Sequence, residues 1–437
     1  MPPTVTLEPP TAVVEIVQTL RRAGHEAWCV GGAVRDALLG QAHLDWDLAT
    51  SATPPQVRRL FARTIPVGIE FGTIGVLDAA GVMHEVTTFR RDVQHDGRHA
   101  VVEFGASLDD DLARRDLTIN AIAYDPIART LYDPFGGQAD LARGVVRAVG
   151  VPDARMTEDR LRALRAIRFA SRLGFAIDPA TWQAIVASAP FLARLSPERV
   201  KQELEKTMEQ VARPSVAFAR WRDAGAFAAL IPSLATVGDD VLQAIDRLPR
   251  PGLATRPMRR SLRIAALFSA VPSGGCEPAL KALRFSNQDT AWISALVDRW
   301  GRYGAELGAQ LAGGTSLSGE ALRRLAAAIG RLRVNAFVRL AAARWATAAG
   351  PNVPSPLRVV GLYRQLTHVA FHQPIEVADL AIDGDDLRKA GVRPGPQMGQ
   401  LLARLLDQVL ADPACNTPAL LLAQLPQLVA DAQPPRG

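Results

Sequence analysis

"VGGAVRDALLGQAHLDWDLAT", residues 30 to 50, decides the fold of the first part of the chain. It predicts a buried strand that runs into a glycine turn, then a short helix, then a strand that alternates apolar and polar residues. Because residues i and i+2 of a strand point to the same face, Asp45 and Asp47 project together. The apolar residues that pack behind them are Leu44, Trp46 and Leu48.

This acidic pair and the glycine turn before it predict a phosphate and metal site. Two adjacent carboxylates repel one another, and a divalent cation removes that penalty. Gly31 and Gly32 expose backbone N–H groups before a helix, where Arg35 supplies a cation. Taken singly, the carboxylates fit a solvated edge strand, the glycines fit a tight turn, and Arg35 fits a surface ion pair with Asp36. Together they indicate a magnesium–triphosphate site.

The composition of the whole chain favours a multidomain protein with a polyanionic partner. Its 437 residues are enough for roughly three domains, 48% are hydrophobic, and the net charge is +6. The three cysteines, Cys29, Cys276 and Cys415, have no paired or metal-ligand spacing, which indicates a reducing compartment. No export signal or apolar run approaching 18 residues is present. We therefore expect a cytoplasmic protein with no membrane contact and no stable protein partner.

The pattern along the chain predicts an α+β part followed by an all-α part. Up to about residue 150, strand-like and helix-like segments alternate, including a hairpin over "GTIGVLDAAGVMHEVTTFR", residues 72 to 90. After "VGVPDARM" the chain becomes a series of amphipathic helices, of which "EDRLRALRAIRFASRLG", residues 158 to 174, is the first. Stretches rich in Pro and Gly near 250 to 258, 271 to 279 and 350 to 356 predict turns between helices.

"GGAVRDALLG" followed by "DWDLAT" resembles the signature of class II CCA-adding enzymes and bacterial poly(A) polymerases, within the polymerase β-like nucleotidyltransferase superfamily. The resemblance implies that Asp45 and Asp47 hold two magnesium ions. It also implies a third catalytic carboxylate, Glu85, on a neighbouring strand, within "HEVTTFR". The corresponding fold is a nucleotidyltransferase head with a small mixed or antiparallel sheet, followed by helical parts. The expected domains are a head over 1–150, a neck over 151–212, a body over 213–350 and a tail over 351–437.

The next family block corresponds to "DDLARRDLTINAIA", residues 110 to 123. Its polar residues precede an apolar run, as though they were presented at the edge of a core. By resemblance the block recognises the phosphates and the ribose of a nucleotide. Arg115 is assigned to phosphate, and Asp116 and Asn120 to the ribose; Gly32 and Arg35 complete the phosphate contacts.

The helical stretch "EDRLRALRAIRF", residues 158 to 169, predicts how the base is chosen. Arg162, Arg165 and Arg168 recur every third residue and so share one face, which fits either a solvated basic face or a bound anion. The stretch is similar to the family's EDxxR motif, in which Asp and Arg act as an amino-acid template for C and A. Asp159 and Arg162 occupy those positions on what is expected to be one helix. Arg165 and Arg168 are expected to face the triphosphate or the RNA backbone.

These motifs predict template-independent addition of CCA to the 3′ end of tRNA from CTP and ATP. The segment "RRDVQHDGRHAVVEF", residues 90 to 104, is similar to the flexible loop of CCA-adding and A-adding members. The tail, expected to bind tRNA, lacks the strongly basic extension usual in poly(A) polymerases, which are the rival enzyme class. A catalytically inactive RNA-binding protein is the rival from another class. Phe71 stands where the family more often has His, and His95-Asp96 gives only weak support for a phosphohydrolase.

Overall fold

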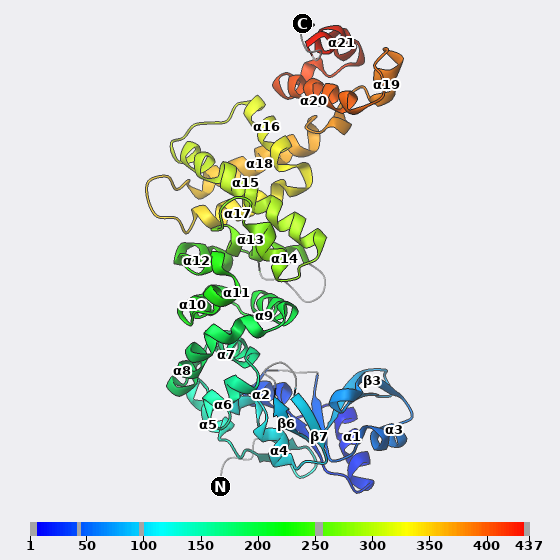
Figure 1. The fold of residues 1–437 in the computed structure, drawn as a ribbon, viewed down its shortest axis with the longest axis vertical. Helices are drawn as coiled ribbons and strands as arrows, with labels where there is room; N and C mark the ends of the chain where they lie inside the picture. Colours follow the sequence, from blue (N-terminus) through cyan, green and yellow to red (C-terminus); the bar gives the residue numbers. More distant parts are fainter. Residues whose placement is uncertain (1–6, 42–44, 96–99, 250–256, 432–437) are drawn as a thin grey trace. The chain divides into compact units, whose positions relative to one another are not determined.

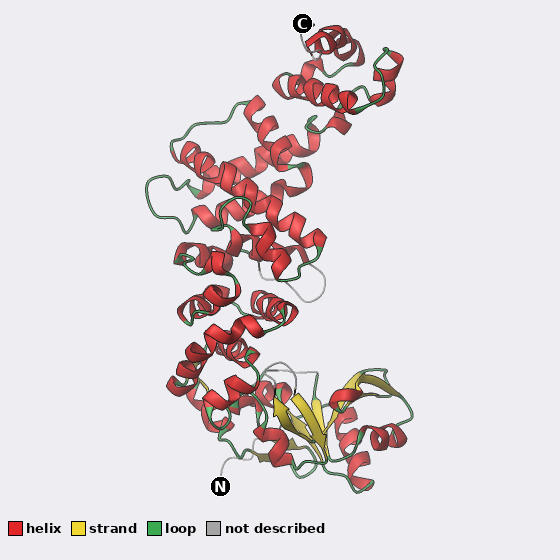
Figure 2. Cartoon of the chain, viewed as in Figure 1, coloured by secondary structure: helices red, strands yellow, loops and turns green. Residues whose placement is uncertain are grey.

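The computed structural model describes residues 7–41, 45–95, 100–249 and 257–431. The chain forms two compact units, residues 1–236 and 237–437. Strands occur in the first unit, and the described residues of the second unit form helices and loops (Figures 1 and 2). The expected α+β class followed by helices is confirmed. The finer division into head, neck, body and tail stays a prediction.

A mixed seven-stranded sheet forms the base of the first unit. Its strands, in spatial order, are β3 (Thr64–Gly68), β4 (Thr73–Leu77), β5 (Met83–Thr88), β2 (Asp47–Thr50), β1 (Ala27–Val30), β8 (Ala123–Asp125) and β9 (Thr130–Tyr132). All neighbouring pairs are antiparallel except β2 and β5, which run parallel with Leu48 opposite Val86. The predicted hairpin corresponds to β4 and β5.

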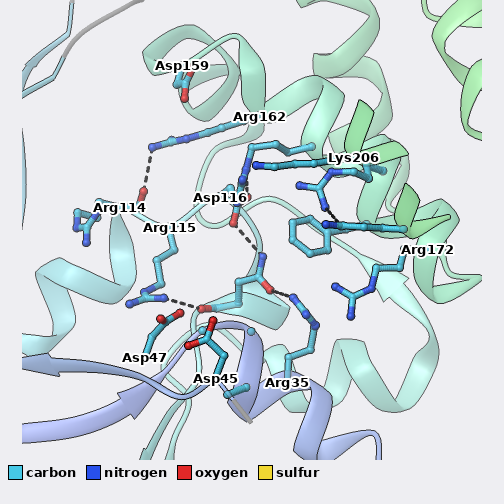
Figure 3. Close-up of a pocket in the computed structure, with 18 of the residues that line it drawn as sticks. Arg35, Asp45, Asp47, Arg114, Arg115, Asp116, Asp159, Arg162, Arg172 and Lys206 are labelled. Atoms are coloured by element: carbon cyan, nitrogen blue, oxygen red, sulfur yellow. Dashed lines mark hydrogen bonds and ion pairs between the residues drawn. The ribbon is translucent and has the colours of Figure 1, made fainter. Parts of the chain in front are cut away.

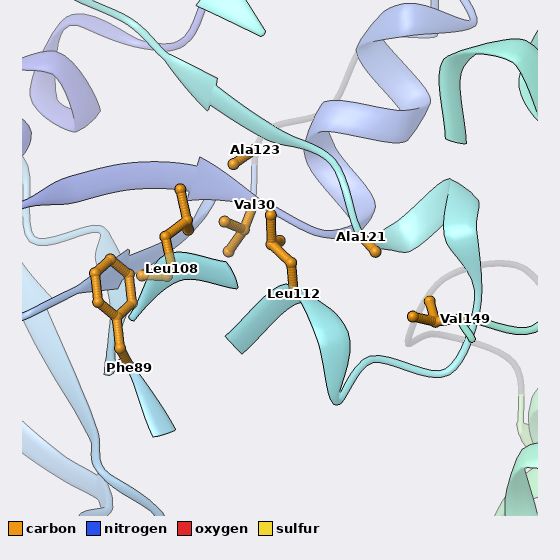
Figure 4. Close-up of a cluster of buried hydrophobic side chains, with 8 residues drawn as sticks. Val30, Phe89, Leu108, Leu112, Ala121, Ala123 and Val149 are labelled. Atoms are coloured by element: carbon orange, nitrogen blue, oxygen red, sulfur yellow. The ribbon is translucent and has the colours of Figure 1, made fainter. Parts of the chain in front are cut away.

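Five helices accompany this sheet, and an apolar core fixes the segments that will carry the site. The helices are α1 (Thr11–Arg22), α2 (Gly32–Leu38), α3 (Pro54–Leu60), α4 (Leu108–Ala113) and α5 (Gly137–Arg143). One buried cluster joins the end of β1 to α4 and β8 (Figure 4); its members are Val30, Ala49, Phe89, Leu108, Leu112, Ala121, Ala123 and Val149. Burial of these side chains holds the polar residues between α4 and β8 at the edge of the core.

The segment predicted to be a flexible loop is a β-hairpin in its described part. Strands β6 (Arg90–His95) and β7 (Ala100–Phe104) pair antiparallel, with an irregular register between Asp92 and Gln94. The hairpin is separate from the main sheet. Residues 96–99, including Asp96 of the weak phosphohydrolase signal, lie outside the described residues.

Helices follow the sheet, and here one prediction is wrong. They are α6 (Pro152–Glu158), α7 (Leu161–Leu173), α8 (Pro179–Ser188), η3 (Ala189–Arg194), α9 (Pro197–Gln210), α10 (Pro214–Asp223) and α11 (Ala226–Leu230). Residues 158 to 173 do not form one helix, because Asp159 is extended with φ −145° and ψ 105°. Its carboxylate accepts the backbone N–H of Leu161 at 3.1 Å, so it caps a new helix instead of continuing α6. A short parallel pair also occurs here, between β10 (Val145–Val146) and β11 (Ala176–Ile177).

The second unit is helical throughout its described residues. Its helices are α12 (Asp239–Asp246), α13 (Pro257–Phe268), α14 (Cys276–Ala282), α15 (Asn287–Ala312), α16 (Gly319–Ile329), α17 (Val334–Trp345), α18 (Pro356–His372), α19 (Gly384–Lys389), α20 (Pro396–Ala411) and α21 (Pro418–Asp431). Residues 250–256, part of a predicted turn, lie outside the described residues. No helix in the described ranges is long and apolar enough to span a membrane.

Candidate active site

One pocket of about 640 Å³ in the first unit contains almost all of the predicted site residues (Figure 3). Its walls come from the β1–α2 turn, the start of β2, the segment between α4 and β8, and helices α7 and α9. The predicted residues that line it are Gly32, Arg35, Asp45, Asp47, Arg115, Asp116, Asn120, Asp159, Arg162, Arg165 and Arg168. Glu85 is the predicted site residue that does not line this pocket.

The acidic pair lies at one end of the pocket. Strand β2 begins at Asp47, and Asp45 precedes it, yet burial still alternates: Trp46 and Leu48 are buried while both carboxylates face the pocket (Figure 3). Leu44 lies outside the described residues. Burial, then the charges of Asp45 and Glu85, raise the pKa of Asp47 to about 6, while Arg115 lowers it. Negative charge is therefore concentrated at this end of the site.

The carboxylates fit a magnesium ion that is also bound by its substrate. Among the described residues, no group of three or more Asp, Glu, His or Cys side chains is arranged to hold a metal ion. Mg²⁺, however, usually binds one or two protein carboxylates and completes its shell with substrate phosphates and water. The oxygen ligands and the raised pKa of Asp47 match this requirement. The parallel register of β2 and β5 brings Glu85 next to Asp47, where its charge acts without lining the pocket.

Gly31 makes room for two pocket side chains. Its φ is +79°, in the left-handed region that favours glycine. A Cβ at this position would lie 3.1 Å from Nη1 of Arg115 and 3.6 Å from Oδ2 of Asp47. The glycine turn therefore lets the guanidinium and the carboxylate approach the backbone, and each would have to move if position 31 carried a side chain.

Arg35 lies deeper than a phosphate ligand on a surface helix would. Its side chain is 2% exposed, and it forms a buried ion pair with Asp36, with Nε and Nη2 both 2.7 Å from Oδ1. Nη1 donates to Oδ1 of Asn120 at 2.5 Å, and Arg172 binds the other oxygen of Asp36 at 3.0 Å. The surface ion pair considered from the sequence is thus a buried network that also lines the pocket.

The segment from Asp111 to Asn120 forms a second polar wall. Asp111 is buried and pairs with Arg114 at 2.7 Å and Arg115 at 3.1 Å. Asp116 accepts from Nδ2 of Asn120 at 3.1 Å and from the backbone N–H of Leu117 at 2.9 Å. These bonds fix the orientation of the block, as its position before an apolar run predicted.

The predicted template pair occupies the other end of the pocket from two separate elements (Figure 3). Asp159 caps α7 with one oxygen, and its other oxygen pairs with Arg199 of α9 at 2.7 Å. Arg162 pairs with Glu158 at 2.6 Å and donates to the carbonyl of Arg114 at 2.9 Å. The expectation that both residues share one helix is wrong, because the chain breaks from helix at Asp159.

Arg165 and Arg168 share a face of α7 with Arg162, as their spacing predicted, and all three line the pocket. Each already has a carboxylate partner within the protein. Arg165 pairs with Asp116 at 2.8 Å, and Arg168 pairs with Glu203 of α9 at 2.7 Å. Burial alone would raise the pKa of Asp116, but the charge of Arg165 and the bonds to this carboxyl hold it at about 2. Carboxylates of the protein itself therefore relieve part of the repulsion between these arginines.

Several pocket residues were not among the predicted ones. They are Ala33, Arg90, Arg114, Phe169, Arg172, Lys206 and Gln210. Helical spacing could have identified Arg172, which follows Arg168 by four residues on α7. Lys206 and Gln210 are likewise four residues apart on α9, a segment that the sequence indicated only as structural. Arg90 lies on β6, within the segment predicted to be a flexible loop.

Two family models match parts of the chain. Residues 27–147 match the poly A polymerase head domain, and residues 174–237 match a probable RNA and SrmB-binding site of polymerase A. The CCA-adding enzyme of Lactiplantibacillus plantarum is 34% identical over 97% of both chains. The chain belongs to the CCA-adding enzyme family.

Other CCA-adding enzymes are also similar to this chain, over different shares of its length. The CCA-adding enzyme of Geobacillus kaustophilus is 44% identical over 62% of this chain and 66% of its own length. The chain spans about half to two thirds of the length of the first Geobacillus relatives it matches. The crystal structure of the Bacillus stearothermophilus CCA-adding enzyme in complex with CTP superposes with a TM-score of 0.74 at 31% identity, covering 99% of this chain and 100% of that one. CCA-adding enzymes are nucleotidyltransferases that typically use a divalent metal.

Proposed function

We propose that the protein adds CCA to the 3′ end of tRNA, one nucleotide at a time, from CTP and ATP and without a nucleic-acid template. The observation that carries this proposal is the presence, in one pocket, of an acidic pair at one end and a base-reading Asp and Arg at the other. Between them lie arginines suited to a triphosphate. An acidic pair alone would fit many metal enzymes, whereas this combination also accounts for nucleotide choice.

The acidic end would carry out the transfer. Asp45 and Asp47 would hold two magnesium ions, and Glu85 would add a third negative charge beside them, which opposes ionisation of Asp47 until a cation binds. When bound, the two ions stabilise the entering 3′-hydroxyl oxygen and the oxygen that leaves with pyrophosphate. Arg115 binds the phosphates. It lies beside Gly31, and its positive charge lowers the pKa of Asp47. Gly32 and Arg35 complete this wall, and Asp116 and Asn120 orient the ribose.

Asp159 and Arg162 would select the base by hydrogen-bond complementarity. Cytosine and adenine each present an amine donor beside a ring-nitrogen acceptor, so a carboxylate can accept from the amine while a guanidinium donates to the ring. Uracil and guanine present a carbonyl where the amine would be, which leaves the carboxylate facing an acceptor. Since both side chains already have protein partners, binding of the base exchanges some of these bonds. Arg165 and Arg168 then lie toward the phosphates.

We assign the cytoplasm as the compartment, because the three cysteines of the chain are all unpaired thiols and tRNA processing needs no export. The basic excess of the chain suits tRNA as the polyanionic partner. No membrane contact and no stable protein partner enter this proposal.

The test is extension of tRNA that lacks its last three nucleotides, incubated with magnesium and CTP, ATP or both, with product lengths read on a sequencing gel. The expected products are two added nucleotides with CTP alone and three with both. Long A tracts would instead identify a poly(A) polymerase. An RNA-binding protein would give no extension and would lose nothing on Asp45→Ala, whereas the proposed enzyme loses all extension in that variant while keeping its fold.

A further inference from the structure

Two arginines pack against one exposed phenylalanine next to the base-reading end of the pocket. Cζ of Arg160 lies 4.7 Å from the centroid of the Phe191 ring, and Cζ of Arg194 lies 5.2 Å from it. Both distances fall within the range of a favourable cation–π contact. Phe191 is 40% exposed, so its ring is accessible to a ligand at the surface. We call these three residues the arginine–phenylalanine cluster.

Local structure places the three side chains together. Phe191 and Arg194 are three residues apart in the short helix η3, and side chains at that spacing eclipse one another in a 3₁₀-helix. Arg160 stands between α6 and α7, directly after Asp159, and its Nη1 donates to Oγ of Ser188 at 3.4 Å. The cluster is therefore built by segments that are fixed in the fold and not by a chance meeting of long surface side chains.

The charge of this cluster is not balanced within the described part of the protein. Most neighbouring arginines have a carboxylate: Arg155 and Arg162 share Glu158, and Arg199 binds Asp159. Among the residues that the structure describes, neither Arg160 nor Arg194 has a carboxylate at ion-pair distance. Burial, and then the charge of Arg194, lower the pKa of Arg160. Two like charges held against one ring would be relieved by an external anion.

We propose that the arginine–phenylalanine cluster binds phosphates of the RNA backbone close to the 3′ end that is being extended. This inference rests on the proposed function, and it names a contact outside the pocket. Guanidinium groups match the geometry of phosphate oxygens, and a ring beneath them limits their motion before binding. The arginines inside the pocket already serve the nucleotide. Arg160 directly follows Asp159 in the chain, so the cluster is built from the same α6–α7 connection as the proposed base-reading residue.

The test measures RNA affinity and catalysis separately in the Arg160→Ala/Arg194→Ala double variant. Binding of tRNA lacking CCA is followed by fluorescence anisotropy without CTP or ATP, at several salt concentrations. The Kd is expected to rise on the order of tenfold near 0.1 M salt, and the slope of log K against log salt is expected to fall in magnitude by up to about 2. The kcat at saturating tRNA stays close to that of the parent, while KM for tRNA rises.

Two further variants keep this test decisive. Arg160→Lys/Arg194→Lys retains both charges but not the guanidinium geometry, so it is expected to keep the salt slope of the parent and to recover part of the affinity; an equal loss of salt slope in both double variants would contradict direct phosphate binding. Arg58→Ala/Arg59→Ala removes the same charge from α3, and an equal loss there would show a general effect of net charge. Unchanged affinity and salt slope in the alanine variant would overturn the proposal. Since binding is measured without nucleotides, these results are independent of whether the protein extends tRNA.

Discussion

Asp47 is a carboxylate that the fold makes difficult to ionise. Burial and the charges of Asp45 and Glu85 raise its pKa to about 6, against an ordinary value of 3.8. A raised carboxyl pKa means that the folded state prefers the protonated side chain, so ionisation above pH 6 costs stability in the absence of a cation. The difference of about two pKa units corresponds to at most about 3 kcal/mol. A bound cation would offset this cost, because it favours the ionised carboxylate.

The first prediction concerns Asp47→Asn in EDTA. Below about pH 3 the parent and the variant should differ least in unfolding temperature, because Asp47 is then protonated in both the folded and unfolded states. As pH rises from 3.8 to about 6, the unfolded state releases the proton that the folded state keeps, so the parent should lose stability relative to the variant; the difference should level off above about pH 6.5. Thermal unfolding by circular dichroism from about pH 3 to 8 measures this.

Magnesium supplies the complementary observation for Asp47. At pH 8 the cation should raise the Tm of the parent and have a smaller effect on the variant, because one ligand has lost its charge. An equal response of both proteins to magnesium, or a parent that matches the variant at pH 8 in EDTA, contradicts the electrostatic account. The variant should also fail to extend tRNA.

Gly31 gives a second prediction at the scale of one residue. Gly31→Ala adds a Cβ that lies 3.1 Å from Arg115, at φ 79° and ψ −134°, a conformation that costs a residue with a side chain about 1–3 kcal/mol. Gly40→Ala is the control for a positive φ, because Gly40 has φ +70° but nothing within 4 Å of the added Cβ. We expect both variants to lose stability in chemical denaturation, and only Gly31→Ala to lose about tenfold or more in kcat/KM. Equal kinetic losses would mean that crowding of Arg115 is unimportant.

At the scale of elements, α9 supports Asp159, the proposed base-reading residue between α6 and α7. Arg199 binds one oxygen of Asp159, while the other oxygen accepts the backbone N–H of Leu161. Without Arg199, the carboxylate keeps its bond to Leu161 but loses the bond that fixes its outer oxygen. If Asp159 reads the base, its orientation therefore depends on a residue 40 positions further along the chain.

Arg199→Ala is expected to weaken nucleotide choice more than it weakens catalysis. The ratio of kcat/KM for CTP over UTP should fall by about tenfold, because a carboxylate held by fewer bonds discriminates less sharply. Lys201→Ala is the control, since it removes one positive charge from the same helix and leaves the bond between Arg199 and Asp159 in place. Single-nucleotide extension assays with each triphosphate measure the ratios. If kcat/KM for CTP and for UTP fell by the same factor, Arg199 would only support the fold.

The β1–α2–β2 segment, the β4–β5 hairpin and the shared face of Arg162, Arg165 and Arg168 could be predicted, because each depends on a local sequence pattern. The ion-pair partners of those arginines could not be predicted from the sequence. Asp116 and Glu203 lie 49 and 35 residues away from Arg165 and Arg168, and only tertiary packing brings them together. The helix break at Asp159 was hidden because the amphipathic pattern continues through it. The parallel pairing of β2 with β5, which brings Glu85 to Asp47, likewise depends on sheet topology.

At the scale of the whole molecule, the candidate active site is confined to one of the two compact units. Every residue that lines the pocket lies between Gly31 and Gln210, and the first unit extends to residue 236. Nucleotide binding should therefore not require the second unit. We expect binding of a large RNA to draw on surface from both units, since arginines and lysines occur in both.

A fragment of residues 1–236 tests this separation. We expect it to unfold cooperatively and to bind CTP with a Kd within about fivefold of the whole chain, because all pocket contacts are internal to it. Its affinity for tRNA should be at least about tenfold weaker. Isothermal titration with CTP and anisotropy with tRNA measure the two values, and Asp159→Ala in the same fragment controls for nonspecific nucleotide binding. Loss of CTP binding in a folded fragment would show that the second unit completes the pocket.

The confinement of the pocket to the first unit also bears on how the protein is made. Ribosomes add about 5–20 residues each second, so synthesis of residues 237–437 takes roughly 10–40 s after the first unit is complete. This interval is longer than the time in which a typical small domain folds. The pocket of the first unit can therefore form while the rest of the polypeptide is still being translated. Two arginines of α7 are then already paired with Asp116 and Glu203.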